Sequence, residues 1–340
     1  MTDHPVTTAV LLVGGFGTRL RPLTLTTPKQ MLPVAGPTML ERVLAHLAGH
    51  GITRAVLALG YRADGFTEAY PDDRCAGVDL LYAVEPEPLD TAGAVRFAAT
   101  VAGIDETFLV LNADVLTDLD ITELVAFHRS RGAEGTIHLT PVEDPSRFGV
   151  VPIDQDGRVQ AFIEKPPVGE APTNWINGGV YVLEPSVLAR IESGRRVSIE
   201  REVFPAMVAD RTLFAIERAG RWVDAGTPAT YLQASLEYLD GTAASEPPVA
   251  DSAAVADTAT VAYSWVGDGA IVETGATLDR ALVLPGATVG SGATVRSSII
   301  GPNAFVGPRS TITGLSVVGD GAVVEPDSVL HDARVPSGDE

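Results

Sequence analysis

The 340-residue chain contains a single cysteine, Cys75. One thiol excludes an internal disulfide framework and is compatible with a reducing compartment, so we expect a cytoplasmic protein. We also expect no secretory signal, because the apolar run at residues 6–13 has no basic residue before it and leads directly into glycines. No stretch is long and apolar enough to cross a bilayer, which argues against a membrane protein.

Basic residues are scarce as well. The chain has 24 Lys and Arg against 44 Asp and Glu, which gives a formal net charge of −20 at pH 7. Such a chain repels nucleic acid and anionic membranes at long range, so neither is an expected partner. Any phosphate-binding site must therefore be locally basic. Hydrophobic residues make up 45% of the chain, which is enough for a large core and argues against disorder.

The histidines do not follow the spacing of a metalloenzyme motif. His46 and His50 are four positions apart, but they fall on a polar helix end and have no paired acid. We interpret the histidines as surface residues and do not favour a zinc site. The six are His4, His46, His50, His128, His138 and His331.

A glycine-rich, basic turn follows the first predicted strand. The aliphatic run at residues 8–13 predicts a buried strand, which Gly14, Gly15 and Gly17 interrupt. Without a Cβ atom, glycines allow backbone N–H groups to approach a phosphate closely. Three cations come next and make the turn a candidate phosphate site; these are Arg19, Arg21 and Lys29.

Two familiar phosphate loops do not fit this turn. A Walker loop needs Lys and then Ser or Thr after its glycines, whereas Thr18 and Arg19 follow Gly17. A dinucleotide fingerprint needs a third glycine where Leu20 stands. The residues alone also allow a plain strand-to-loop turn with solvated arginines.

Apolar runs and amphipathic segments alternate over residues 1–240. This spacing predicts a mostly parallel sheet covered by helices, with ligands bound beyond the carboxyl ends of the strands. Thr91 is the predicted N-cap of the second helix. The expected strands are residues 52–61, 78–84 and 107–111, and the expected helices are residues 39–51 and 91–103.

Two aspartates are candidate metal ligands. Asp114 follows the predicted strand at 107–111, and Asp224 lies in the segment WVDAGTP before a glycine turn. Aspartate in such places is often a helix cap or a turn former. Mg²⁺, however, is typically held by one or two carboxylates together with substrate phosphates.

The segment between these aspartates contains a second group of candidates. Residues 146–166 predict a hairpin with Asp156 and Gly157 at its turn and a charged pair at its end. Residues 174–183 predict a strand that two glycines interrupt, where a ligand could approach the backbone. The alternative is an exposed charge pair and a β-bulge.

The string GGFGTRLRPLTLTTPKQ closely resembles the signature of the sugar-1-phosphate nucleotidyltransferases, also called nucleotide-sugar pyrophosphorylases. The segments EPLDTAGAVRFA, FGVV, EKP, NGGVY and WVDAGTP are also similar to that family, and most similar to mannose-1-phosphate guanylyltransferases with a hexapeptide-repeat tail. Two positions depart from the pattern. Gln30 stands where many members have proline, and Asp90 replaces a usual glycine.

The resemblance implies a Rossmann-like domain and a role for each matching residue. Catalysis falls to Arg19 and Lys29, and Mg²⁺ binding to Asp114 and Asp224. The nucleotide-binding positions are Leu12, Gly14, Gly15, Gly17, Thr18, Glu87, Pro88 and Gly93. The sugar-phosphate positions are Gly149, Glu164, Lys165, Asn177 and Gly178.

A regular repeat occupies the C-terminal part. An aliphatic residue recurs every six positions, and the phase slips by one at the end of each of the first three coils. This pattern predicts about five coils of a triangular parallel β-helix, each with three short strands. The array resembles hexapeptide-repeat β-helices, which implies left-handed coiling. Equivalent positions fall at Val249, Val266, Val283, Ile300 and Val318, so the last interval is one position longer than the others.

These patterns together divide the chain. The expected domains are residues 1–240 (catalytic), 241–248 (linker) and 249–335 (β-helix). Many hexapeptide proteins are acyltransferases with a histidine base, but the only histidine in this array is His331 in its last turn. Acyl transfer is therefore not favoured, and we expect the β-helix to form a homo-oligomer.

The predicted activity is nucleotidyl transfer from an NTP to a sugar 1-phosphate, which releases pyrophosphate. GTP and mannose 1-phosphate are the preferred substrates. The same chemistry with dTTP, UTP or ATP and a glucose, heptose or cyclitol phosphate is the alternative, because hydroxyl stereochemistry is read by a few hydrogen bonds that sequence spacing does not reveal. A non-catalytic regulatory subunit that binds nucleotide sugar is the alternative of another class.

Overall fold

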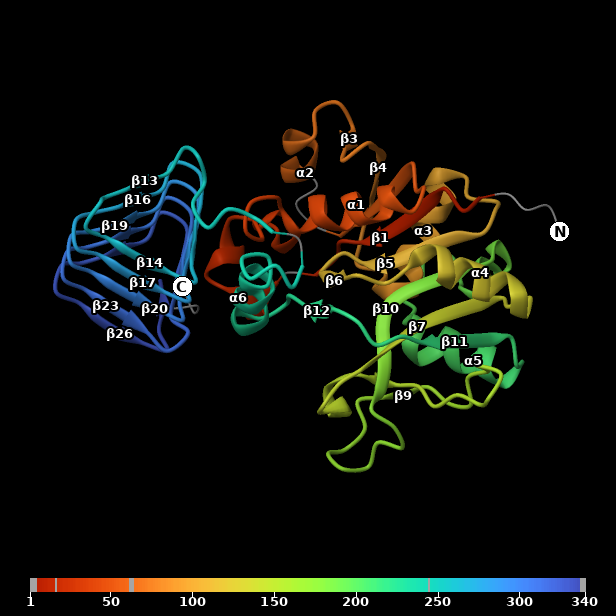
Figure 1. The fold of residues 1–340 in the computed structure, drawn as a ribbon. Coiled ribbons are helices and arrows are strands. Elements are labelled where there is room, and N and C mark those ends of the chain that lie inside the picture. Colours follow the sequence, from red (N-terminus) through yellow and green to blue (C-terminus); the bar gives the residue numbers. More distant parts are fainter. Residues whose placement is uncertain (1–4, 16, 61–63, 244, 337–340) are drawn as a thin grey trace. The chain divides into compact units, whose positions relative to one another are not determined.

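A computed structural model describes residues 5–15, 17–60, 64–243 and 245–336 (Figure 1). The chain forms two compact units. The sheet unit comprises Met1–Gly15 and Leu40–Trp222, and the β-helix unit comprises Phe16–Met39 and Val223–Glu340. These units divide the chain differently from the expected linker at 241–248, so the expected domain boundaries stay a prediction.

The sheet unit is built on a mixed sheet with the strand order β11-β7-β10-β5-β1-β2-β4-β3. Its parallel part surrounds β1, in which Val10 lies opposite Val56 on one side and Val110 on the other. This part confirms the predicted strands and the Rossmann-like alternation of strand and helix. Its strands are β1 (Thr8–Leu12), β2 (Arg54–Leu59), β4 (Val78–Val84) and β5 (Phe108–Asn112).

Antiparallel strands extend the sheet on both sides. The long strand β10 (Trp175–Leu183) runs antiparallel to β5 and to β7 (Gly135–Pro141), and β11 (Leu213–Glu217) is parallel to β7. At the other edge β3 (Arg74–Cys75) pairs antiparallel with β4. The short strands β8 (Gly149–Val150) and β9 (Ile163–Glu164) also belong to this sheet, whereas β6 (Val115–Thr117) and β12 (Trp222–Asp224) lie outside it.

Helices cover this sheet. The small-residue helix α3 (Asp90–Ala102) contacts β1, β2 and β4, and its alanines join the core with Val10, Phe108 and Tyr181. Asp120 caps α4 by accepting a hydrogen bond from Glu123 N at 3.0 Å. The other helices of this unit are α1 (Met39–Gly49), α2 (Asp64–Ala69), α4 (Ile121–Arg131) and α5 (Phe204–Ala209).

The start of α3 corrects one expectation. Thr91 is not the cap, because the helix begins at Asp90 and the N-cap position is Leu89. The Thr91 hydroxyl instead donates to Glu200 Oε2 and accepts from Ile199 N, both at 2.8 Å. Thr91 therefore links α3 to the segment before α5.

The interpretation of the histidines as surface residues was wrong for two of them, and His4 lies outside the described residues. His128 and His138 are 1% and 2% exposed. His128 contacts Thr136 Oγ1 at 2.8 Å and Glu184 Oε1 at 3.1 Å, and burial lowers its pKa. Within the described ranges, no group of three or more His, Cys, Asp or Glu side chains is arranged to hold a metal ion.

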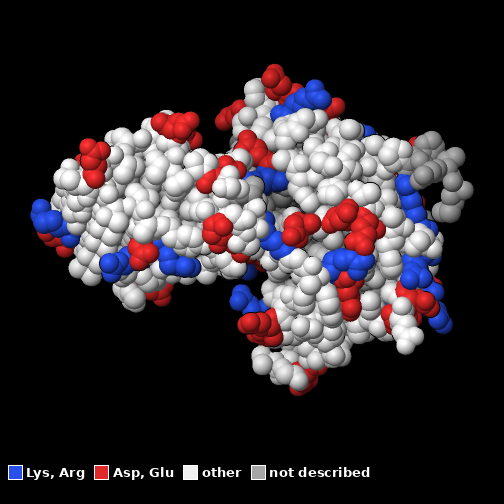
Figure 2. All heavy atoms as spheres, in the orientation of Figure 1, with Lys and Arg blue, Asp and Glu red and all other residues white. Residues whose placement is uncertain are grey.

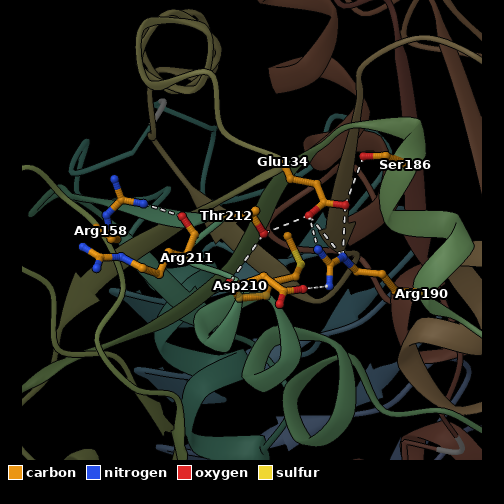
Figure 3. A network of polar contacts seen from close by, with 8 residues as sticks. Glu134, Arg158, Ser186, Arg190, Asp210, Arg211 and Thr212 are labelled. Carbon is orange, nitrogen blue, oxygen red and sulfur yellow. Dashed lines mark hydrogen bonds and ion pairs between the residues drawn. The ribbon is translucent and has the colours of Figure 1, made fainter.

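A half-buried polar network lies at the β11 edge of the sheet (Figure 3). Arg190 donates to both carboxylate oxygens of Glu134, and its Nη1 is 2.6 Å from Asp210 Oδ2. Ser186 and Thr212 donate to the same glutamate. The carboxylate is thus fully hydrogen-bonded, as a charge shielded from water must be.

The β-helix unit contains three parallel sheets, each with five short strands among the described residues. Val255 pairs with Val272 and Val272 with Val289, whereas Ile300 pairs with Val318, so the coil after Ile300 is one position longer. The predicted repeat and its change of spacing are confirmed. The sheets are β13 (Ala254–Val255), β16 (Ile271–Val272), β19 (Thr288–Val289), β22 (Phe305–Val306) and β25 (Val323–Val324); β14 (Thr260–Ala262), β17 (Thr277–Asp279), β20 (Thr294–Arg296), β23 (Thr311–Thr313) and β26 (Val329–His331); and β15 (Trp265–Val266), β18 (Leu282–Val283), β21 (Ile299–Ile300), β24 (Val317–Val318) and β27 (Arg334–Val335).

The inward residues of each coil form a continuous apolar column. Val272, Val289 and Val306 lie in this column and are at most 1% exposed. The unit also contains α6 (Pro228–Leu236), which starts with a capping box between Thr227 and Thr230.

On the face visible in Figure 2, acidic and basic side chains are interspersed among uncharged ones. None of the described helices is long and apolar enough to cross a membrane.

Candidate active site

The turn after β1 is conformationally demanding. Gly15 has φ of 109° and Gly17 has φ of 58°, values that favour glycine. A Cβ atom on Gly17 would lie 3.0 Å from Thr24 Cγ2, and Gly17 O accepts hydrogen bonds from Thr24 Oγ1 at 2.7 Å and Leu20 N at 2.8 Å. The tight turn is confirmed, and phosphate binding there stays a prediction.

Short helices follow Gly17 and carry the two predicted catalytic cations. They are η1 (Thr18–Leu20), η2 (Leu23–Leu25) and η3 (Lys29–Met31). Arg19 lies in η1 and Lys29 begins η3. The chain has only two lysines, Lys29 and Lys165, and both are predicted site residues.

Arg19 lies beside the predicted metal ligand Asp224. Its Nη2 is 3.8 Å from Asp224 Oδ2, and Asp224 Oδ1 accepts a hydrogen bond from Gly226 N at 3.0 Å. A Cβ atom on Gly226 would lie 2.6 Å from Arg19 Nη2. The glycine therefore leaves room for the guanidinium beside the carboxylate.

In the sheet unit, candidate residues lie at the carboxyl ends of neighbouring strands. Leu12 ends β1, and its carbonyl accepts from Ala113 N at 3.1 Å. Half-buried Asp114 follows at once. Because β1, β2, β4 and β5 run parallel, their carboxyl ends share one edge of the sheet, where open α/β sheets bind ligands.

Buried Tyr181 lies in β10, the strand that also holds the predicted sugar-phosphate residues Asn177 and Gly178. Burial is the main reason that the pKa of Tyr181 is raised, and the charges of Glu200, Glu164 and Asp114 add to it. Asn177 Nδ2 donates to the Tyr181 hydroxyl at 2.8 Å. Tyr181 therefore holds the side chain of Asn177, a predicted sugar-phosphate residue.

The two glycines of β10 form a β-bulge. The pairing with β7 shifts register between Asn177 and Tyr181, and Gly179 has φ of 74°. A Cβ atom on Gly178 would lie 2.4 Å from His138 Nδ1, and Gly178 O accepts from Trp222 Nε1 at 2.9 Å. Packing accounts for both glycines, and contact of Gly178 with a ligand stays a prediction.

The predicted hairpin is confirmed. β8 pairs antiparallel with β9, and the turn is closed by Gly157 N, which donates to Asp154 O at 3.0 Å. At its end Lys165 has φ of 50°, and its Nζ is 3.1 Å from Glu164 Oε1. A Cβ atom on Gly149 would lie 2.7 Å from the Phe162 ring. Positive φ at a lysine is rare and marks Lys165 as a constrained position.

The loop after β4 and the first turn of α3 carry the predicted base-binding residues. Glu87 and Pro88 are exposed, whereas Gly93 is buried and a Cβ there would lie 2.9 Å from Arg195 O. Asp90 has φ of 62°, and its Oδ1 accepts from Thr91 N at 2.8 Å. Aspartate tolerates this left-handed conformation, so the substitution of the usual glycine preserves the turn.

Sequence reasoning missed Glu85 in this loop. Glu85 is 9% exposed, its carboxylate accepts a hydrogen bond from Leu89 N at 2.8 Å, and burial raises its pKa. The signal was available, because an acid that directly follows an apolar strand is what identified Asp114.

A cavity of about 240 Å³ lies on the His138 side of the β10 bulge. It is lined by His138, Trp222, Arg218 and the segment from Thr117 to Asp120, among others. No predicted site residue lines it, so the candidate site does not include this cavity.

The two predicted metal ligands could supply only part of the coordination of Mg²⁺. Asp114 and Asp224 supply the hard oxygen ligands that this ion prefers. Since neither belongs to a described group of three possible ligands, further oxygens would come from substrate phosphates and water.

The candidate residues are distributed over both units. The β-helix unit holds Gly17, Thr18, Arg19, Lys29 and Asp224. The sheet unit holds Leu12, Gly14, Gly15, Glu87, Pro88, Gly93, Asp114, Gly149, Glu164, Lys165, Asn177 and Gly178.

Comparison with known proteins gives two family matches. The family model described as Nucleotidyl transferase matches residues 8–241, and the one described as GMPPB C-terminal domain matches residues 245–337.

Curated relatives match this chain over a region about as long as the first of these two matches. The chain is 44% identical over 244 residues to the mannose-1-phosphate guanylyltransferase catalytic subunit beta of Drosophila pseudoobscura pseudoobscura, which covers 71% of this chain and 65% of that protein. It is 43% identical over 249 residues to the mannose-1-phosphate guanylyltransferase of Mycobacterium tuberculosis, which covers 72% and 68%. The matched region thus spans about two thirds of the length of these relatives.

Solved structures are similar to this chain over about two thirds of its length. HddC from Yersinia pseudotuberculosis has a TM-score of 0.60 at 28% identity, covering 68% of this chain and 100% of that one. A structure of HddC complexed with GMP-PN has a TM-score of 0.59. A putative glucose-1-phosphate thymidylyltransferase from Bacillus anthracis has a TM-score of 0.61 at 25% identity, covering 68% and 94%.

Proposed function

Because this chain belongs to the nucleotidyl transferase family, we propose that it transfers a guanylyl group from GTP to mannose 1-phosphate and releases pyrophosphate. The observation that carries the proposal is its 43–44% identity to relatives named mannose-1-phosphate guanylyltransferases. All proposed site residues lie within the matched residues 8–241.

In the proposed reaction an oxygen of the sugar phosphate attacks the α-phosphorus of GTP in line. The new phosphorus–oxygen bond forms as the bond to the β-phosphate oxygen breaks, and pyrophosphate leaves with the electron pair. The attacking phosphate already carries its charge, so no protein nucleophile is needed. Catalysis then depends on positioning and on stabilising charge.

Arg19 and Lys29 are the proposed stabilisers of that charge. Both follow the glycine turn, whose backbone can approach the triphosphate of the nucleotide. The carboxylate of Asp224, 3.8 Å from Arg19, supports the arginine's orientation. Cations held in place before the reaction lower the barrier more than mobile ones, because no reorganisation is needed at the transition state.

The sugar phosphate is proposed to bind at the residues around Tyr181. Lys165 would pair with its phosphate, and Glu164 and Asn177 would accept or donate hydrogen bonds at sugar hydroxyls. The constrained backbone of Lys165 and the hydrogen bond from Asn177 to Tyr181 support fixed positions for these groups. Mg²⁺ held by Asp114 and Asp224 would neutralise phosphate charge when bound.

The preference for guanine is proposed to involve the loop after β4. Glu85 offers a buried carboxylate there, and a carboxylate accepts hydrogen bonds from adjacent N–H donors such as those on the guanine edge. Glu87 and Pro88 in this loop and Gly93 in the first turn of α3 are the other proposed base-binding residues.

The test is pyrophosphate release by the purified protein with Mg²⁺. GTP, dTTP, UTP, ATP and CTP are each combined with mannose, glucose and other sugar 1-phosphates. Release specific to GTP with mannose 1-phosphate is expected. Release with another pair would overturn the substrate assignment, and binding of nucleotide sugar without any release would overturn the enzymatic function.

We also propose that the protein acts in the cytoplasm and as a homo-oligomer. Its one cysteine, Cys75, is buried and free. Three outward positions of one β-helix sheet carry exposed apolar side chains, since Ile271, Phe305 and Val323 are 44%, 37% and 58% exposed, and Thr288 lies between the first two. Light scattering of the protein and of Phe305→Glu tests the assembly, and an unchanged mass in the variant would count against this face.

A further inference from the structure

The loop that carries Arg19 and Lys29 contacts the β-helix at one turn. We call residues 17–39 the signature loop; it belongs to the same compact unit as the β-helix. Thr26 Oγ1 donates to Asp320 Oδ2 at 3.0 Å. Pro22 packs against Gly319, because a Cβ atom on residue 319 would lie 2.9 Å from Pro22 Cβ. Two neighbouring residues of the turn after β24 therefore hold two points of the loop.

Asp320 is itself held by the β-helix. Its second oxygen, Oδ1, accepts a hydrogen bond from Asn303 Nδ2 at 3.1 Å. The backbone on either side bonds to other coils, since Gly319 N donates to Val335 O at 2.6 Å and Gly321 N to Pro302 O at 2.8 Å. The carboxylate thus has a fixed orientation, with one oxygen used by the β-helix and one by the loop.

The contacted part of the loop packs directly on the residues beside the cations. Thr24, two positions before Thr26, donates to Gly17 O, and the same carbonyl accepts from Leu20 N at the end of η1. A Cβ atom on Gly17 would also lie 3.4 Å from Lys29 Cβ. A shift of residues 22–26 would therefore move both η1 with Arg19 and η3 with Lys29.

The other end of the loop is held independently. The Tyr231 hydroxyl of α6 donates to Pro33 O, and Tyr231 is fully buried. Loss of the Asp320 contact would consequently loosen the cation-bearing part of the loop without releasing the whole loop.

We propose that Asp320 is a positioning residue for nucleotidyl transfer, acting through Thr26 to keep Arg19 and Lys29 in their reactive places. The inference rests on the proposed function, because the value of fixed cations lies in the phosphate chemistry. Asp320 itself contacts no reactant in this proposal. The β-helix is thereby part of the catalytic apparatus as well as a surface for assembly.

The kinetic test uses Asp320→Ala and Thr26→Val in the full-length protein. Removal of one hydrogen bond to a charged group is expected to lower kcat roughly threefold to tenfold, with a smaller change in KM for GTP. Asp320→Asn keeps an oxygen that can accept from Thr26 and should recover most of kcat. The matched control is Asp327→Asn, whose carboxylate pairs with Arg309 elsewhere on the β-helix, and it should retain the wild-type rate.

A second readout does not depend on activity. Amide hydrogen exchange over residues 18–32 reports the bonds of Leu20 and Leu32 to Gly17 O and Lys29 O. Exchange there should be faster in Asp320→Ala and Thr26→Val, and the double variant should be no worse than either single one. A wild-type protein without nucleotidyl transfer would overturn the proposed function and leave this test intact. Unchanged exchange and kcat in both single variants, or additive losses in the double variant, would overturn the positioning role.

Discussion

Gly178 and His138 exclude a side chain between them, since a Cβ atom on residue 178 would lie 2.4 Å from His138 Nδ1 and 3.0 Å from the His138 carbonyl oxygen. Gly178→Ala should therefore overpack the core and lower the free energy of unfolding by about 1 to 3 kcal/mol. Urea denaturation measures the change. Gly49→Ala, at the end of α1 with open space around its Cβ position, is the control and should cost nothing.

A second substitution identifies the cause. In a His138→Ala background the imidazole is gone, so the penalty of Gly178→Ala should shrink. An equal penalty in both backgrounds would mean that the contact with the ring does not explain the glycine.

Stability should fall as the pH drops below about 6.5. Burial lowers the pKa of His138 to about 4, whereas an unfolded histidine titrates near 6.5. Between these values the unfolded chain binds a proton that the folded chain does not, so acid favours unfolding by up to about 3 kcal/mol at pH 4. Denaturant unfolding at pH 5 and pH 7.5 tests this. His138→Gln should reduce the slope, and a variant with the full wild-type slope would refute the assignment.

Arg190 should matter more to stability than an exposed arginine does. Its side chain is 23% exposed and that of its partner Glu134 is 15% exposed, so Arg190→Ala leaves a half-buried carboxylate without its main donor (Figure 3). We expect a loss of about 2 to 3 kcal/mol. Arg190→Lys should not restore it, because lysine lacks the planar fork. Arg309→Ala, which removes a pair that is 65% and 61% exposed, should leave the unfolding midpoint unchanged; similar losses in both variants would contradict the argument.

Lys29→Ala and Asp114→Ala should each reduce turnover by at least roughly a hundredfold while the fold survives, by analogy with the loss of one preorganised donor. Pyrophosphate release measures turnover, and circular dichroism checks the fold. Asp118→Ala, which removes an exposed aspartate four positions after Asp114, is the matched control. Near-normal turnover in a site variant would refute the role of that residue.

Periodic features were predictable from the sequence. The aliphatic residues that recur every six positions indicated the register of the β-helix, because each buried position must face the same column. The strands at 78–84 and 174–183 were predicted from their apolar runs to within one residue. A β-bulge at Gly178 and Gly179 was one of two interpretations of the sequence. The register shift of β10 and the packing of Gly178 against His138 support it.

Features that depend on partners distant in sequence were not predictable. His128 and His138 are buried because Thr136, Glu184 and the β10 bulge surround them, and no local pattern shows this. Thr91 looked like a helix cap, but Glu200 binds its hydroxyl. The contact between Thr26 and Asp320 joins positions far apart in the chain, which no spacing rule can reveal.

Because equivalent positions pair in successive coils, the number of coils sets the length of the β-helix. Each coil bonds to the coil before it and the coil after it, so a copied block such as residues 272–288 could be inserted without changing any inward contact type. Every added block would lengthen the protein by one strand spacing, about 4.8 Å. The length of the β-helix could thus be changed by design in fixed steps.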